Sequence, residues 1–542
     1  MSKTTRLQRW LAIFRVILLG AGALAALLAL LYAFANWQGS RAWRDERQRI
    51  EALGRRTEIQ ALVPPAVPDH ENFARIPLLR PLFDYTRHQG EVWAGVQWRD
   101  TNGYRLAYEA LAFGDSQKKR FKDPKEPSWT RGERLDLKAW QAAFRNPKQQ
   151  DAIIANLAST GQNTNLTLLP EDAPAGRDIL NLLGQYQKVF DTLATGVLLP
   201  HSRFPVHYEE VYSALLPHLH LLKRFTSRFS LRATAYLAES HPDKAAEDVA
   251  TCLRLADATR TEPFIISQLV RHAALDIALQ PAWEGIITHA WTESQLALLQ
   301  SQFTTIDLMA GWRRGMETER AAAVWAVKKM AGSMESRRLM AEMYEAIGNP
   351  SRSDVRPAFP LPYALVAPQG WFYGSLADAS KSMEQLENST PQNIPTLRSS
   401  WHPTQQPLRI SRLLYHCLMV NGVGKLSVTY INTVRRQIHL ELAATACALE
   451  RHRLANGSYP DTLAPLVPKY LPAVPVDPID GQPLRYRRDA ADRFALWSVG
   501  ENGTDDGGAL PKGGESTTYE GDWVWRWPVQ DSADPSQPEP SP

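Results

Sequence analysis

The sequence predicts a mainly α-helical protein with a single N-terminal transmembrane helix and a small α+β domain at its C-terminal end. Residues 16–37 form an uncharged apolar run, residues 133–345 carry apolar side chains at helical spacing, and residues 484–498 contain two short strand-like stretches. With 542 residues, of which 44% are hydrophobic, the chain is long enough for about three domains of roughly 150 residues each.

The charge and the cysteines of the chain argue against two classes of function. The formal net charge is only +4, and no Lys/Arg cluster interleaved with aromatic residues follows the apolar run, so we expect no nucleic-acid partner. Cys252, Cys417 and Cys447 form no CxxC pair, so neither a zinc site nor a redox motif is predicted. Each cysteine lies in an apolar helical stretch, and we expect small buried hydrophobic residues.

The apolar run at residues 16–37 reads VILLGAGALAALLALLYAFANW. As a helix it would extend about 33 Å, which is enough to cross a hydrocarbon core of roughly 30 Å. Ala33-Phe34-Ala35 matches the cleavage pattern of a signal peptide, but the run exceeds the roughly 7–15 apolar residues of such peptides. We therefore expect a retained anchor that contacts membrane lipid through residues 16–37.

Residues 38–62 are charged and carry apolar side chains at roughly helical spacing, which predicts a juxtamembrane helix. The prolines within residues 63–68 end this helix. The stretches 91–98 and 104–113 are rich in aromatic and β-branched residues. The turn sequence Asn102-Gly103 therefore predicts a β-hairpin between them.

The middle of the chain predicts amphipathic helices. Residues 177–199 form one, and residues 231–258 read as two helices joined by a tight turn, with Pro242 near the start of the second. Ser240 and Asp243 are the expected capping residues. The pair is similar to a tetratricopeptide hairpin, but no second copy follows at the period of about 34 residues, so a generic helical bundle and a helical-repeat platform both stay open.

The C-terminal region begins with a long helix over residues 408–454, which we expect to be interrupted at residues 421–424. Gly457 ends this helix. Two short strands, residues 484–487 and 494–498, follow and are joined by a polar turn.

This succession resembles the globular part of the major pseudopilin of type II secretion systems. The likeness rests on four pieces in order: LERHRLANGSYPDTLAPLV (449–467), VDPIDGQPLRYR (476–487), SVGENGTDD (498–506) and GDWVW (521–525). It stops at this domain, because residues 16–37 lack the Glu that a pseudopilin carries five residues into its hydrophobic helix. Packing into a helical pilus is therefore not expected.

The resemblance implies a calcium site in the loop after the second strand. Calcium takes about six to eight oxygen ligands. The residues that the resemblance places there are Ser498 and Glu501, through their carbonyls, and Asn502, Asp505, Asp506 and Asp522. The sequence departs from the family at Asn502, where Asp is common, and in the longer stretch 509–520. The Asn-Gly and Asp-Asp-Gly-Gly sequences are also ordinary turn sequences, so a metal-free turn is the alternative.

A second resemblance concerns the helical middle. Residues 201–222 and 261–283 resemble uncharacterised membrane-anchored proteins of planctomycete- and verrucomicrobia-type bacteria. This likeness implies no activity.

The basic residues around the anchor do not by themselves give the expected orientation. Four basic residues precede or enter the run and six follow it closely, so a bare count favours a cytoplasmic C-terminus. The pseudopilin-like domain belongs outside the cytoplasm in its relatives. We therefore expect a single-pass protein of the bacterial inner membrane, with a cytoplasmic N-terminus and the bulk of the chain in the periplasm.

One segment could carry catalysis. Histidines and carboxylates crowd into residues 201–220: His201, His207, Glu209, Glu210, His218 and His220. On a helix His218 and His220 would lie about 200° apart and could not easily share a metal. The sequence contains no HExxH, phosphate-loop or GxSxG motif, so we expect no enzyme.

The sequence therefore predicts a non-enzymatic envelope scaffold or interaction protein with unidentified protein partners, and domain analogy alone links it to a secretion or pilus-like assembly. The alternatives are an envelope hydrolase that uses residues 201–220 and a helical-repeat peptide-binding module. The expected division is a cytoplasmic N-terminus (1–15), the transmembrane helix (16–37), a juxtamembrane helix (38–62), a mainly helical domain (63–348), an irregular linker (349–407) with one helix near 376–386, the pseudopilin-like domain (408–527) and a disordered tail (528–542).

Overall fold

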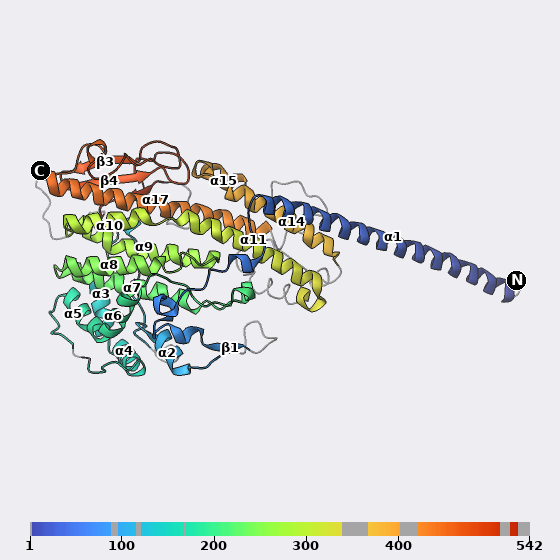
Figure 1. Cartoon of the computed structure of the whole chain (residues 1–542), viewed down its shortest axis with the longest axis horizontal. Helices are drawn as coiled ribbons and strands as arrows, with labels where there is room; N and C mark the ends of the chain where they lie inside the picture. Colours follow the sequence, from blue (N-terminus) through green and yellow to red (C-terminus); the bar gives the residue numbers. More distant parts are fainter. Residues whose placement is uncertain are drawn as a thin grey trace, which may run out of the picture. The chain divides into compact units, whose positions relative to one another are not determined.

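The computed structural model describes residues 3–87, 96–114, 121–166, 168–338, 367–400, 420–509 and 521–528. It confirms a mainly helical fold with a long apolar N-terminal helix and a small antiparallel sheet near the C-terminus (Figure 1). The chain divides into two compact units. Unit 1 draws on residues 1–62, 316–389 and 400–428, and unit 2 on residues 63–315, 390–399 and 429–542.

The α-helices and strands have the following bounds: α1 (Lys3–Ala52), β1 (Tyr85–Arg87), β2 (Val96–Trp98), α2 (Thr101–Glu109), α3 (Leu137–Arg145), α4 (Pro147–Ser159), α5 (Ala175–Leu183), α6 (Gln187–Gly196), α7 (Pro217–Ala238), α8 (Pro242–Asp257), α9 (Ile265–Ile287), α10 (Glu293–Thr305), α11 (Leu308–Gly332), α14 (Gln369–Glu387), α15 (Ile394–Ser400), α17 (Val420–Asn456), β3 (Arg485–Ala490), β4 (Arg493–Ser498) and β5 (Trp523–Trp525). Much of the described part of the predicted linker is thus helical, in α14 and α15.

Helix α1 is, among the described helices, the one that is long and apolar enough to cross a membrane. Its large apolar side chains are exposed from Trp10 to Trp37, whereas Trp43 and Ile50 are buried. The same helix therefore has an exposed apolar half and a half that packs on protein. It ends at Ala52, short of the predicted end at residue 62.

In unit 1 the packed half of α1 crosses α14 at two glycines. A Cβ atom on Gly39 would overlap the carbonyl of Gly370, and a Cβ on Gly370 would overlap the carbonyl of Ala35, so only glycine permits this approach. Residues 316–332 of α11 complete the core. Its buried members include Trp43, Val324, Val327, Met330, Phe372 and Leu376.

Ion pairs continue the contact of α1 with α14 away from the crossing. Arg49 pairs with Glu384, and Arg55 pairs with Glu387. The same Glu387 accepts from the fully buried Arg320 of α11, with Nη2 2.7 Å from Oε1. Removing one partner of such a buried pair typically costs about 3–5 kcal/mol, so these contacts fix the arrangement of the three helices.

In unit 2 the first departure from the predictions is local. The β-hairpin predicted around Asn102-Gly103 is wrong, because these residues begin α2. The side chain of Asp100 caps this helix, since its Oδ1 accepts from the backbone N–H of Gly103 at 2.8 Å. Strand β2 pairs instead with β1, antiparallel, with Tyr85 opposite Trp98.

Two other helix predictions need correction. The single helix predicted over residues 177–199 is two helices, α5 and α6, separated by a 3-10 turn at Gly184–Tyr186. Between α7 and α8 neither predicted residue caps the helix. Ser240 adopts a positive φ of 60°, and Asp243 accepts from the side chain of Gln295 at 2.6 Å. Pro242 does stand at the start of α8, as predicted.

The centre of unit 2 is formed by α7, α8 and α9, which all pack on one another. Arg232 on α7 donates to both carboxylate oxygens of Asp248 on α8, at 2.8 and 2.6 Å, with both side chains buried. The buried Cys252 and Cys447 agree with the prediction of small buried residues, and Cys417 lies outside the described residues.

From Thr429 onwards, helix α17 belongs to unit 2, as does the sheet that follows it. The interruption predicted at residues 421–424 is wrong, because α17 is continuous there, whereas Gly457 ends the helix with a φ of 80°, as predicted. Strands β3 and β4 confirm the two predicted strands and pair antiparallel, and β5 pairs with β4.

Polar contacts tie this C-terminal region to the helices of the middle. Arg436 of α17 lies 3.0 Å from Asp276 of α9, measured from Nη2 to Oδ2. The indole N–H of Trp283 donates to the carbonyl of Arg526 at 2.9 Å, and the amide of Gln300 donates to that of Tyr470 at 2.7 Å. The C-terminal region and the middle helices therefore form one body.

Glu450 on α17 is the centre of the strongest of these contacts. It is fully buried and accepts from the Tyr459 hydroxyl at 2.5 Å and from Arg453 at 2.7 and 2.9 Å, and its Oε1 lies 3.0 Å from Nδ1 of His289. Burial alone would raise the pKa of Glu450. The hydrogen bonds from His289, Arg453 and Tyr459 outweigh it and lower that pKa to about 2.

We expect the Glu450→Gln variant to lose about 2–4 kcal/mol of unfolding free energy at pH 7, because buried donors lose an ionised partner. Since the pKa of Glu450 is lowered from 4.5 to about 2 in the folded chain, its stabilisation is present above pH 4.5 and is lost as the pH falls towards 2. Urea unfolding in detergent at pH 7 and pH 3.5 measures the difference, with the exposed Glu247→Gln as control. An equal loss at both pH values would contradict the account.

Candidate functional site

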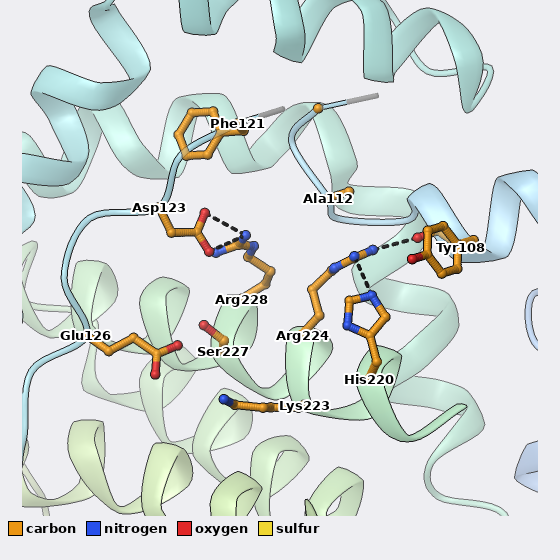
Figure 2. A pocket seen from close by; sticks show the side chains of 11 residues that line it. Tyr108, Ala112, Phe121, Asp123, Glu126, His220, Lys223, Arg224, Ser227 and Arg228 are labelled. Atoms are coloured by element: carbon orange, nitrogen blue, oxygen red, sulfur yellow. Dashed lines mark hydrogen bonds and ion pairs between the residues drawn. The ribbon is translucent and has the colours of Figure 1, made fainter. Parts of the chain in front are cut away.

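A polar cleft in unit 2 is the candidate functional site. It consists of two adjoining cavities, of ≈ 290 and ≈ 330 Å³, that share the lining residues Glu126, Lys223 and Ser227. Lys223 and Ser227 lie four residues apart on α7 and therefore project from one face of that helix. Figure 2 shows the Glu126 carboxylate, the Ser227 hydroxyl and the Lys223 ammonium directed into a common space.

Two arginines of α7 form the walls of the first cavity. Arg228 donates to both carboxylate oxygens of Asp123 at 2.9 Å, and its guanidinium carbon lies 4.3 Å from the ring centroid of Phe113. Arg224 donates to the carbonyl of Tyr108 at 2.5 Å (Figure 2). Both guanidinium groups are thus held in place by protein contacts, which fixes the shape of this end of the cleft.

The second cavity lies between α9 and α17. Arg436 pairs with Asp276, and the ring of His439 lies 4.8 Å from the ring of Trp129, edge to face. Nδ1 of His439 is 3.9 Å from Oδ1 of Asp276, too far for a hydrogen bond. Burial lowers the pKa of His439 in spite of Asp276, so this imidazole is neutral at pH 7.

The charge of the lining indicates what the cleft could bind. Four basic residues and two acidic residues line the second cavity. The basic ones are Arg131, Lys223, Arg435 and Arg436, and the acidic ones are Glu126 and Asp276. Indole rings of Trp129 and Trp140 lie beside them. Carboxylates already pair with all three arginines, so this lining suits a polar ligand.

Sequence reasoning missed this cleft because its residues come from four distant segments: 108–140, 220–231, 273–280 and 435–439. No short motif carries it. The one available signal was the pair Arg224 and Arg228, which lie four residues apart and therefore share one face of a helix.

Three of the residues predicted to bind calcium converge in the structure. Oδ2 of Asp506 accepts from the Asn502 amide at 2.9 Å, and both oxygens of Asp522 accept backbone N–H groups of the loop, at 3.3 and 2.7 Å. Asp522 is buried. Burial, with the charges of Asp505 and Asp506, raises its pKa to about 6.

The other three predicted ligands direct their side chains elsewhere. Their partners are Asp477 for Ser498 (3.0 Å), Arg435 for Glu501 (3.4 Å), and Trp497 (2.9 Å) and Arg485 (3.5 Å) for Asp505. Ser498 and Glu501 were expected to bind calcium through backbone carbonyls, so their side-chain contacts do not bear on the prediction. The side chain of Asp505 was expected to bind calcium, and its contacts with Trp497 and Arg485 disagree with that prediction. Within the described residues no group of three or more His, Cys, Asp or Glu side chains is placed to hold a metal ion.

The His/Glu segment at residues 201–220 does not gather into one site. His218 is fully buried, with Nε2 2.6 Å from Oε1 of the buried Glu262, and stacks on Phe204 at 4.0 Å. His220 lines the cleft instead. His201, His207 and Glu209 are exposed and Glu210 is half-buried.

Comparisons with protein-family models, with curated proteins and with solved structures found no match to this chain.

The burial of His218 and Glu262 predicts a structural role for this pair. We expect Glu262→Gln to lower the unfolding free energy by about 2–4 kcal/mol, because a buried partner of His218 is lost. The exposed control His207→Ala should change it by about 0.5 kcal/mol or less. Thermal and urea unfolding of both variants in detergent checks this expectation. Similar losses of unfolding free energy for both variants would contradict a structural role of the His218–Glu262 pair.

Proposed function

We propose that this chain is a non-enzymatic, membrane-anchored scaffold or interaction protein of the bacterial envelope. The observation that carries the proposal is the division of α1. Large apolar side chains are exposed from Trp10 to Trp37, whereas the helix contacts α14 at Ala35 and Gly39 and is buried at Trp43 and Ile50. Since each such side chain left in water forgoes about 1.5–3 kcal/mol, a bilayer is the solvent that suits this half of the helix.

The proposed topology has residues 1–15 in the cytoplasm, residues 16–37 in the inner membrane and the rest of the chain in the periplasm. The resemblance of the C-terminal region to an extracytoplasmic pseudopilin domain supports this orientation. The order of a long helix ended by Gly457 and an antiparallel β3–β4–β5 sheet is consistent with that resemblance.

We propose a helical bundle rather than a helical-repeat platform for the middle of the chain. In a solenoid each repeat contacts only its neighbours along the chain. Here α7, α8 and α9 each contact the other two, and α17, far away in sequence, also contacts α9. These contacts support one bundle with a shared core.

The cleft supports an interaction role. Its fixed arginines and mixed polar lining could receive a segment of a partner protein, and the pseudopilin resemblance makes a component of a secretion or pilus-like assembly the partner that we propose. This step is an analogy between domains.

An affinity isolation of the tagged full-length chain tests this function. We expect the chain in the membrane fraction, released by detergent but not by high salt, together with secretion-type partners in stoichiometric amounts. The Lys223→Glu variant should lose those partners, because it reverses a charge shared by both cavities, whereas the exposed Lys188→Glu should keep them. A chain that is soluble without detergent, or isolated without such partners, would refute the proposal.

We further propose that Asn502, Asp506 and Asp522 form the centre of a calcium site. Support comes from their convergence and from the buried carboxylate of Asp522, which accepts from the backbone N–H groups of Asp506 and Gly508. Bound calcium would neutralise these carboxylates and stabilise the loop.

If this site binds calcium, millimolar calcium should raise the thermal midpoint of the full chain, by an amount that corresponds to about 2.7 kcal/mol at a hundredfold excess over Kd. The Asp506→Asn variant should lose the effect, and the exposed Asp492→Asn should keep it. Calorimetry in detergent after chelation, with magnesium as the competing ion, measures these shifts. An unchanged midpoint of the unmodified chain with calcium would rule the site out.

A further inference from the structure

The beginning of α14 lies beside the end of the exposed apolar half of α1. The Tyr32 hydroxyl donates to the carbonyl of Ala367 at 3.4 Å, and the backbone N–H of Gly370 donates to the Asn36 side chain at 2.9 Å. Residues 367–370 are therefore level with Tyr32–Asn36 along the axis of α1. From there α14 follows α1 away from its N-terminus, as the Arg49–Glu384 pair shows.

The end of α11 reaches the same level. The Gln369 side chain donates to the carbonyl of Ala331 at 2.8 Å, and Arg337 donates to the carbonyls of Met330 at 2.8 Å and Ala367 at 3.1 Å. Residues 331–338 and 367–373, which we name the membrane-proximal tip, are thus assembled around these carbonyls. All of them belong to unit 1.

The helical rise gives the height of this tip relative to a bilayer. From Trp10 to Trp37 the helix extends about 40 Å, close to the roughly 40–45 Å of a bilayer with both headgroup layers. One headgroup layer, roughly 5–7 Å thick, then covers about the last four or five of these residues, which overlap the level of the tip.

The side chains of the tip and its margin are of the kinds that prefer this layer. Trp371 and Tyr373 are half-buried on the first turns of α14, and Met334 is exposed. Lys329, at the margin, lies 5.8 Å from the ring centroid of Trp325, which is also half-buried. Aromatic and basic side chains are enriched at membrane interfaces, where rings meet headgroups and cations meet lipid phosphates.

From this geometry we infer that the membrane-proximal tip inserts into the phospholipid headgroup layer and forms a second membrane contact beside α1. The inference rests on the proposed function, because it requires α1 to span the bilayer. Lipid is the occupant, since the exposed apolar side chains of α1 that end at the level of the tip need lipid around them. Two contacts at the interface would restrict the tilt of unit 1 relative to the membrane.

Fluorescence quenching by nitroxide lipids tests the height of the tip. The full chain, with Cys417 replaced by serine, is labelled at Met334→Cys and reconstituted in vesicles of phosphatidylethanolamine and phosphatidylglycerol. The matched control is Leu53→Cys, because Met334 and Leu53 have the same exposed fraction of 55% and both belong to unit 1. Leu53 lies about 24 Å beyond Trp37 along the chain of α1.

We expect lipids with a headgroup nitroxide to quench roughly half of the fluorescence at position 334 and little at position 53, because the headgroup layer is only a few ångströms thick. A third label at Leu24→Cys reports on the anchor through lipids with an acyl-chain nitroxide. Quenching at 24 without quenching at 334 would overturn the inference alone. The absence of quenching at 24 would overturn the proposed anchor, and the inference with it.

Discussion

The change along α1 from exposed to protein-packed surroundings is the constraint on which unit 1 depends. One uninterrupted helix carries exposed apolar side chains up to Trp37 and buried ones at Trp43 and Ile50. The two glycines of the α1–α14 crossing, Gly39 and Gly370, let the two helix backbones come into close contact next to the exposed half of α1. Because the helix has no break between its halves, any tilt of the apolar half is transmitted to the core around Trp43.

Unit 2 depends on a different principle, which is the burial of charged side chains beside oppositely charged partners. Glu450 and the Arg232–Asp248 pair are buried, and both oxygens of each carboxylate are hydrogen-bonded. Each of these contacts joins separate segments of the chain. Such contacts add little net stability over apolar packing, but a wrong arrangement would leave charges unpaired. The cleft between α7, α9 and α17 keeps its shape because Arg228 and Arg436 are each paired with a carboxylate, that of Asp123 and that of Asp276.

The sequence predicted those features that depend on local pattern. The long apolar helix α1, the start of α8 at Pro242, the end of α17 at Gly457 and the β3–β4 hairpin all follow from residues close together in the chain. The hairpin at residues 102–103 failed because one capping carboxylate, Asp100, outweighed strand-like composition. The cleft could not be predicted, since its lining comes from helices whose packing is set by buried contacts between distant segments.

Both units are discontinuous in the sequence, and this has a consequence for biogenesis. Trp283 in the middle of the chain finds its hydrogen-bond acceptor only at Arg526, and the layer of α9 is completed only by α17. Neither contact can form until the C-terminal end of the chain has been synthesised. The chain therefore finishes folding only after synthesis, and the partner surfaces of its central helices stay uncovered in the meantime.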